Sequence, residues 1–158
     1  CIMGLDMYLR GEKFKRTETK RDENGEFVRD DDGYPIPVEK PMVDGFERTT
    51  EILRLGYWRK HAPLHKMIVD TFANGVDECQ VIHLTADDCR KIAQMLRDRD
   101  FPDDSVCDGF FFGDSNWWEE CCAEADEDAE VFERAAEWSD MDKDGYAYWH
   151  DVEYQASW

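Results

Sequence analysis

Hydrophobic and polar residues alternate in several short segments of the chain, as they do in strands that bury one face. IMGLDMYL alternates near the N-terminus, and TEILRLGYWRK and CQVIHLT are further apolar segments of strand length. Every second residue from Tyr146 to Trp158 falls on one side of the last segment. We therefore predict strands near residues 2–10, 51–58, 78–84 and 145–157.

Apolar residues recur at helical spacing in three other segments. The first helix is predicted over residues 62–75, where proline occupies the first turn and Asn-Gly ends the helix. Thr85 is the predicted N-cap of the second helix, and two aspartates follow it in the first turn. The third helix is predicted over residues 117–138. These elements favour an α+β fold, with a mostly antiparallel sheet covered on one face by three helices.

A long polar segment separates the first two predicted strands. Its Asn24-Gly25 pair is the strongest short hairpin signal in the chain, and Asp32-Gly33 marks a second turn. We predict an exposed hairpin near residues 14–38 that projects from the sheet or extends it. The 158 residues, of which 42% are hydrophobic and 13% aromatic, predict one domain over residues 1–158.

The net charge of −19 is distributed unevenly. Residues 1–60 hold 13 acids against 12 bases, residues 61–113 hold 10 against 5, and residues 114–158 hold 15 against 2. The negative field of the C-terminal part argues against direct binding to nucleic acid. This charge is compatible with binding of a basic protein partner, with binding of cations, or with a role in solubility alone.

The third predicted helix carries most of the excess acid. Its outer face is predicted to hold Glu119, Glu120, Glu124, Glu127, Asp128, Glu130, Glu133 and Glu137. Like charges four residues apart repel one another, and such a stripe is tolerated when it is solvated or used. It is either a solvated face or an acidic docking surface that imitates a row of phosphates.

Cysteines and hydropathy bear on the compartment of the protein. The six cysteines form no CxxC pair or regular framework, which favours reduced thiols in a cytoplasm over disulfides or a zinc site. No apolar run approaches the roughly 18 residues of a membrane span, and the N-terminal sequence lacks the features of a signal peptide. We expect a cytoplasmic protein that does not bind membranes.

Four separated strings carry a resemblance to a known family. GLDMYL at 4–9, GYWRKHAPLHK at 56–66, GFFFG at 109–113 and YQASW at 154–158 resemble a family of small phage and prophage proteins of unknown function. The resemblance implies a phage context, an α+β domain and the cytoplasm of a bacterial host. Some members are named phosphoglycerate kinases, but this chain is far too short for such a kinase and has no glycine-rich phosphate loop.

The string YWRKHAPLH is the best basic and aromatic segment of the chain. It stands before a predicted helix N-terminus, which attracts anions, and an aromatic side chain there can stack on a ligand. The candidate ligand site consists of Asp6, Trp58, Arg59, His65, Phe111 and Gln155. Alternatively, Asp6 and Arg59 form an ion pair, Trp58 and the GFFFG run belong to the core, and His65 is a hydrogen-bonded structural histidine.

DMDKDGYAYWHD, from Asp140 to Asp151, has the acid spacing of a calcium loop. The segment after it is too short for the exiting helix of a calcium-binding hand and alternates like a strand. We predict a helix-to-strand turn at this point. A weak Ca²⁺ or Mg²⁺ site at Asp140, Asp142 and Asp144 stays open, and we expect no other cofactor.

The chain contains no GxSxG, no Cys/His signature and no pair of carboxylates that spacing singles out for acid–base catalysis. We therefore expect a non-enzymatic, acidic phage accessory protein that binds a basic host protein, such as a defence or nucleic-acid-binding factor. The alternative is a protein that binds a small anionic ligand or nucleotide. A third hypothesis is a metal-dependent hydrolase that uses His65, Asp6 and the Asp140 loop. The oligomeric state stays undetermined.

Overall fold

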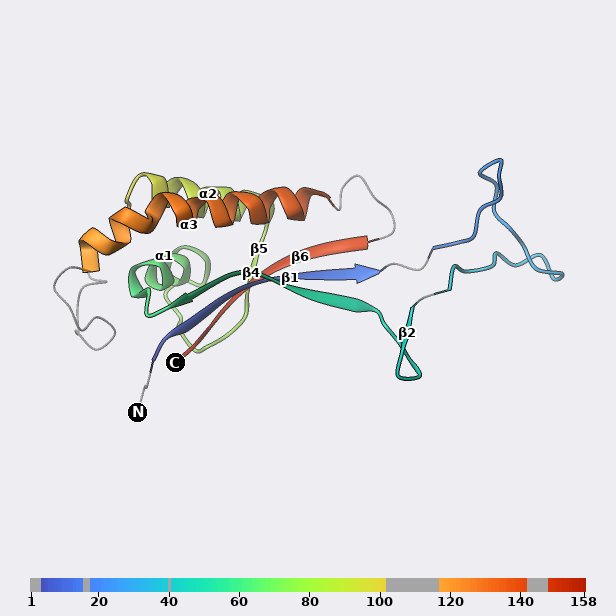
Figure 1. The fold of residues 1–158 in the computed structure, drawn as a ribbon, viewed down its shortest axis with the longest axis horizontal. Coiled ribbons are helices and arrows are strands. Elements are labelled where there is room, and N and C mark those ends of the chain that lie inside the picture. Colours follow the sequence, from blue (N-terminus) through green and yellow to red (C-terminus); the bar gives the residue numbers. More distant parts are fainter. Residues whose placement is uncertain (1–3, 16–17, 40, 102–116, 142–147) are drawn as a thin grey trace.

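The structure is a computed structural model that describes residues 4–15, 18–39, 41–101, 117–141 and 148–158, with only the backbone for residues 15, 117–121 and 148. A four-stranded antiparallel sheet has the order β4-β1-β6-β5. Its strands are β1 (Asp6–Lys15), β4 (Thr50–Arg59), β5 (Ile82–Leu84) and β6 (Tyr148–Ser157). The helices α1 (Ala62–Phe72), α2 (Ala86–Arg97) and α3 (Trp117–Asp140) lie on one side of this sheet (Figure 1). The predicted α+β architecture is thus confirmed.

Two strands differ in extent from the predictions. β1 runs to Lys15 rather than ending near residue 10, because it pairs along its length with both β4 and β6. β5 has three residues rather than seven. Cys79, in the segment before it, has a φ of 57°, which no strand accommodates. Residues 145–147 of the predicted last strand lie outside the described residues.

The helix ends follow local sequence signals. Thr85 caps α2 in a full capping box with Asp88, as the predicted cap requires. α1 begins with proline in its first turn, and its N-cap is His61, whose Nδ1 accepts a hydrogen bond from the Leu64 amide at 3.4 Å. None of the described helices is both long enough and apolar enough to cross a membrane.

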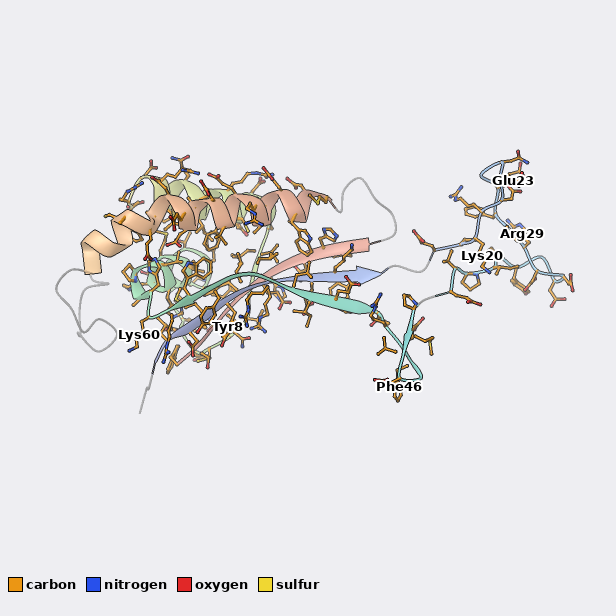
Figure 2. The ribbon with its side chains drawn as sticks, viewed as in Figure 1. Tyr8, Lys20, Glu23, Arg29, Phe46 and Lys60 are labelled. Atoms are coloured by element: carbon orange, nitrogen blue, oxygen red, sulfur yellow. The ribbon has the colours of Figure 1, made fainter. Side chains whose placement is uncertain are left out.

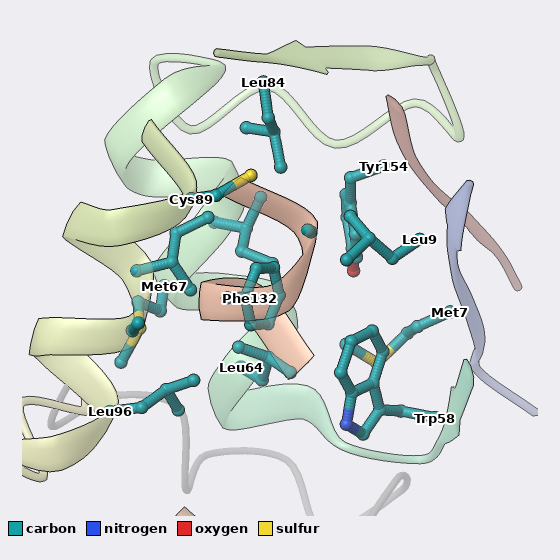
Figure 3. Close-up of a cluster of buried hydrophobic side chains, with 14 of the residues drawn as sticks. Met7, Leu9, Trp58, Leu64, Met67, Leu84, Cys89, Leu96, Phe132 and Tyr154 are labelled. Atoms are coloured by element: carbon teal, nitrogen blue, oxygen red, sulfur yellow. The ribbon is translucent and has the colours of Figure 1, made fainter. Parts of the chain in front are cut away.

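The core lies between the sheet and the helices (Figure 3). Met7 and Leu9 of β1 face Leu64 of α1 and Phe132 of α3, and each of the four is fully buried. Trp58 of β4 stacks on Phe132, with ring centroids 5.4 Å apart. The packing is close enough that a Cβ atom at Gly56 would lie 2.7 Å from the Trp58 ring and 2.9 Å from Val131. Gly56 therefore lets α3 approach β4.

The polar segment after β1 forms a projecting hairpin, as predicted (Figures 1 and 2). It contains the same tight turn twice, eight residues apart. The Asp22 carboxylate accepts hydrogen bonds from backbone amides two and four residues further on, and Asp30 does the same in the second turn. Gly25 and Gly33 adopt the positive φ that both turns require.

A second, smaller hairpin connects this region to β4. Its strands are β2 (Met42–Val43) and β3 (Phe46–Glu47), joined by Asp44-Gly45 with positive φ at both residues. The sequence prediction did not include it. The Asp-Gly pair is the signal that identifies it, because such a pair supplies both positive φ angles of a two-residue turn.

Candidate functional site

The sheet has one face that no helix of the described part covers. In β1 and the residue before it, the side chains of Leu5, Met7 and Leu9 are buried beneath the helices. Asp6, Tyr8 and Arg10 alternate with them and point to the opposite face. Figure 2 shows side chains, Tyr8 among them, on the side of the sheet away from the helices.

Neighbouring strands bring aromatic and cationic side chains together on this uncovered face. We call this group the platform; it consists of Tyr8, Arg10, Arg54, Tyr57, Arg59 and Gln155. Tyr8 and Tyr57 stand directly opposite each other on β1 and β4, with ring centroids 5.3 Å apart. The Arg54 guanidinium lies 5.9 Å from the Tyr8 ring centroid and 5.4 Å from that of Tyr57. The Arg10 guanidinium lies 5.4 Å from the Tyr8 ring centroid. Both tyrosine rings thus contact cations.

Hydrogen bonds fix the edges of the platform. The Tyr57 hydroxyl donates to Asp6 Oδ1 at 2.7 Å, and this hydrogen bond raises the pKa of the Tyr57 phenol. Arg10 Nη2 donates to Gln155 Oε1 at 2.6 Å, and the Gln155 amide donates to the Cys79 carbonyl at 2.9 Å. The segment before β5 therefore positions Gln155, which in turn positions Arg10.

The predicted ion pair between Asp6 and Arg59 is present on this face. Arg59 Nε lies 3.8 Å from Asp6 Oδ1, and the Arg59 side chain is 65% exposed. The pair is therefore solvated rather than semi-buried, and it contributes little stability. Within this group, three guanidinium groups stand against one carboxylate, so it is locally positive although the whole chain carries −19. Glu153, opposite Arg10, begins the acidic half of the same face.

Two predicted ligand residues lie on the other side of the sheet, so their prediction as part of the same site was wrong. Trp58 alternates with Tyr57 and Arg59 and is buried beneath the helices. His65 of α1 is buried as well, with Nδ1 2.6 Å from the Tyr154 hydroxyl and Nε2 2.9 Å from Asp77 Oδ2. Phe111 lies outside the described residues.

The contacts of His65 fit a structural role. An ionised carboxylate only accepts hydrogen bonds, so Nε2–H donates to Asp77 and Nδ1 accepts from the Tyr154 hydroxyl. Tyr154 is 1% exposed, and its burial raises the pKa of the phenol well above the usual range. Asp77 also accepts a hydrogen bond from the Trp158 indole at 3.0 Å. The network therefore connects α1 and the segment before β5 to the end of β6. Because Tyr154 is buried, a substrate cannot reach its hydroxyl.

Asp128 was predicted on the exposed acidic face of α3, and this prediction was wrong. The residue is buried, and its two carboxylate oxygens accept hydrogen bonds from Trp58 Nε1 at 2.9 Å and from His61 Nε2 at 3.0 Å. His61 Nδ1 accepts from the Leu64 amide, so Nε2 carries the proton. Asp128 thus joins α3 to β4 and to the first turn of α1.

Arginines of α2 and of the segment after it neutralise part of the acidic face. Arg97 donates two hydrogen bonds to Glu133, at 2.8 and 3.0 Å, and Arg99 donates to both oxygens of Asp126. These contacts lower the pKa of both carboxyl groups. Four exposed glutamates make no salt bridge with any described residue: Glu124, Glu127, Glu130 and Glu137. The side chains of Glu119 and Glu120 lie outside the described part.

The proposed calcium loop is described only at its first acid. Asp140 forms an ion pair with Arg90 of α2, which satisfies the charge that a cation would otherwise neutralise. Asp142 and Asp144 lie outside the described residues. The weak Ca²⁺ or Mg²⁺ site therefore stays a prediction from the sequence.

Sequence reasoning missed half of the platform. Tyr8, Arg10 and Arg54 were not predicted, whereas Arg59 and Gln155 belong to the predicted ligand site and Tyr57 lies in the string YWRKHAPLH. The signal is the alternation Asp6, Tyr8, Arg10, which places the three side chains on one face of a strand. Three of the four strings that carry the family resemblance meet here, because Asp6 pairs with Arg59 on β4 and with Ser157 on β6.

Comparisons with protein-family models, with curated proteins and with solved structures find no match to this chain. A functional proposal must therefore come from the geometry of the site itself.

Proposed function

We propose that the platform binds an anionic ligand with a planar ring, of the nucleotide class. The observation that carries the proposal is the cluster of Tyr8, Tyr57, Arg10 and Arg54 on the uncovered face of the sheet. This proposal keeps Asp6, Arg59 and Gln155 of the predicted ligand site.

The chemistry of the cluster fits both parts of a nucleotide. Guanidinium groups bind phosphate oxygens through paired hydrogen bonds, and Arg54 and Arg59 are exposed on the same strand. The Tyr57 ring is 44% exposed and offers a surface on which a base can stack. Because the tyrosines and arginines already contact one another, little side-chain entropy is lost on binding.

Nucleotide titrations test this proposal. Full-length protein is titrated calorimetrically with a panel of mononucleotides and dinucleotides at low salt in EDTA. We expect Tyr57→Ala and Arg54→Ala each to weaken binding by about tenfold or more, since stacking on one aromatic ring contributes about 1–3 kcal/mol. Tyr57→Phe keeps the ring and is expected to retain most of the affinity.

The projecting hairpin supplies matched controls. Tyr34→Ala and Arg29→Ala remove the same residue types from exposed positions far from the sheet. Both variants are expected to bind like the wild-type protein. The proposal is wrong if the wild-type protein binds no member of the panel, or if the hairpin variants lose as much affinity as the platform variants.

A second candidate function is the docking of a basic protein partner on α3. It is favoured by the four exposed glutamates without a salt bridge, Glu124, Glu127, Glu130 and Glu137. Attraction of a basic partner to such a row decreases with salt.

A pull-down from bacterial lysate at low and at high salt tests the docking function. The wild-type protein is compared with a variant in which the four glutamates are replaced by glutamine. We expect basic proteins to be retained by the wild-type protein at low salt only, and to be lost by the variant. Retention of the same proteins by both forms contradicts docking on this face.

A further inference from the structure

The half of the uncovered sheet face beside the platform holds side chains that commonly bind metals. His83 of β5 stands opposite Glu153 of β6, and Asp151 lies two residues from Glu153 on the same face. One ligand atom from each of the three residues lies within 4.8 Å of the other two. His83 Nδ1 is 3.2 Å from Asp151 Oδ2 and 3.8 Å from Glu153 Oε1.

We infer that His83, Asp151 and Glu153 bind a divalent transition-metal ion on this face. Metal bonds of about 2.1 Å in a tetrahedral arrangement place two ligand atoms about 3.4 Å apart, close to the separations of His83 Nδ1 from the two carboxylates, 3.2 and 3.8 Å. An imidazole with two carboxylates suits Mn²⁺, Co²⁺ or Zn²⁺ better than Ca²⁺, which takes oxygen ligands. The inference goes beyond the nucleotide proposal and does not depend on it.

The electrostatics of the cluster favour a cation. Asp151 and Glu153 lie two residues apart on β6, and Glu12 of β1 stands opposite Asp151. The basic side chains beside Glu153 are Arg10, opposite it on β1, and His83, opposite it on β5. A divalent ion would neutralise the carboxylates that gather in this half of the face.

The position of the cluster leaves room for further ligands on the ion. His83 is 64% exposed, so its ring is accessible from solvent. The side chains of Asp151 and Glu153 are partly exposed on the same face. Three protein ligands that solvent can reach resemble the open coordination of catalytic metals rather than the closed sets of structural ones.

Titration with Mn²⁺ tests the inference. Mn²⁺ is chosen because it prefers oxygen and nitrogen, whereas the six cysteines would compete for Zn²⁺. Free Mn²⁺ is measured by electron paramagnetic resonance in full-length protein stripped of metal, without nucleotide and at physiological ionic strength. We expect one site per chain, with affinity reduced at least tenfold in His83→Ala and in Glu153→Gln.

A control on the acidic face of α3 separates a site from general attraction to an acidic protein. Glu127→Gln with Glu130→Gln removes two exposed carboxylates of α3 and is expected to leave the Mn²⁺ site unchanged. Glu153→Gln removes a charge that its surroundings disfavour, so this variant is expected to fold, which circular dichroism checks. Binding that is weak and equal in the wild-type protein and His83→Ala overturns the inference. Because nucleotide titrations use EDTA and Mn²⁺ titrations omit nucleotide, either proposal can fail alone.

Discussion

Replacing Asp128 with alanine is expected to lower the free energy of unfolding by about 3 kcal/mol or more. The substitution removes the two hydrogen bonds that Asp128 accepts from the buried Trp58 indole and the buried His61 ring, and loss of a buried donor's acceptor costs about 1–3 kcal/mol. Loss of one partner from a buried charged network is among the most destabilising single changes. Urea unfolding of both proteins at neutral pH measures the difference.

The adjacent Glu127 provides the control. Glu127→Ala removes an exposed carboxylate from the same helix and is expected to change the free energy of unfolding by no more than about 0.5 kcal/mol. Asp128→Asn keeps one acceptor oxygen and is expected to fall between the two alanine variants. Equal effects of the two alanine substitutions would mean that Asp128 is solvated, as the sequence predicted for the whole acidic face.

Stability is also expected to fall steeply above about pH 9. Burial raises the pKa of the Cys89 thiol to about 12, whereas an unfolded chain ionises cysteine near pH 8.5. The folded state therefore keeps a proton that the unfolded state releases, so stability is full below about pH 8.5 and is lost as the pH rises toward 12. Each pH unit in this window costs about 1.4 kcal/mol, or about 3 kcal/mol by pH 11.

Tyr154 adds to this loss at higher pH. Its pKa is also raised by burial, and unfolded tyrosine ionises near pH 10, so its contribution begins above that value. Urea unfolding from pH 8 to 11 in a reducing agent measures the slope. Cys89→Ala is expected to flatten the slope between about pH 8.5 and 10, before tyrosine contributes. An unchanged slope in this variant would exclude Cys89 as its source.

The uncovered face changes the balance between the functional hypotheses. The sequence favoured an acidic docking surface on α3, but Asp128 turns inward and arginines pair with Asp126 and Glu133. The sheet carries a locally positive, aromatic surface. The net charges of the chain segments do not predict it, because residues 1–60 hold almost equal numbers of acids and bases. We therefore rank the nucleotide proposal above docking, and the two sets of variants share no residue.

The metal inference adds a second candidate cluster to the one that the sequence predicted. The sequence drew attention to Asp140, Asp142 and Asp144 because their spacing matches a known loop. His83 is separated from Glu153 by 70 residues, and a spacing argument does not link them. Antiparallel pairing of β5 with β6 places the two side by side.

Local physics accounts for the predictions that were confirmed. The first amide groups of a helix have no partner within the helix. Proline in the first turn of α1 has no amide hydrogen, and the Thr85 capping box supplies acceptors for the amide groups at the start of α2, so both mark helix starts. The Asn-Gly and Asp-Gly pairs mark the hairpin turns because glycine adopts positive φ without strain. Alternation marks β1 and β6 because one face of each meets the helices.

The sequence by itself thus determined the four sheet strands and three helices, the antiparallel α+β class, the projecting hairpin and the excess of acid in α3. Asp128 has the helical spacing of the buried residues Ala125, Ala129 and Phe132. We predicted it on the exposed face because it is charged. Only the tertiary structure decided which side chains meet: the register that joins Tyr8 to Tyr57, the pairing of His83 with Glu153 and the partners of Asp128. Those contacts form between segments far apart in the chain, so the energy that selects them appears only when strands pair and helices pack.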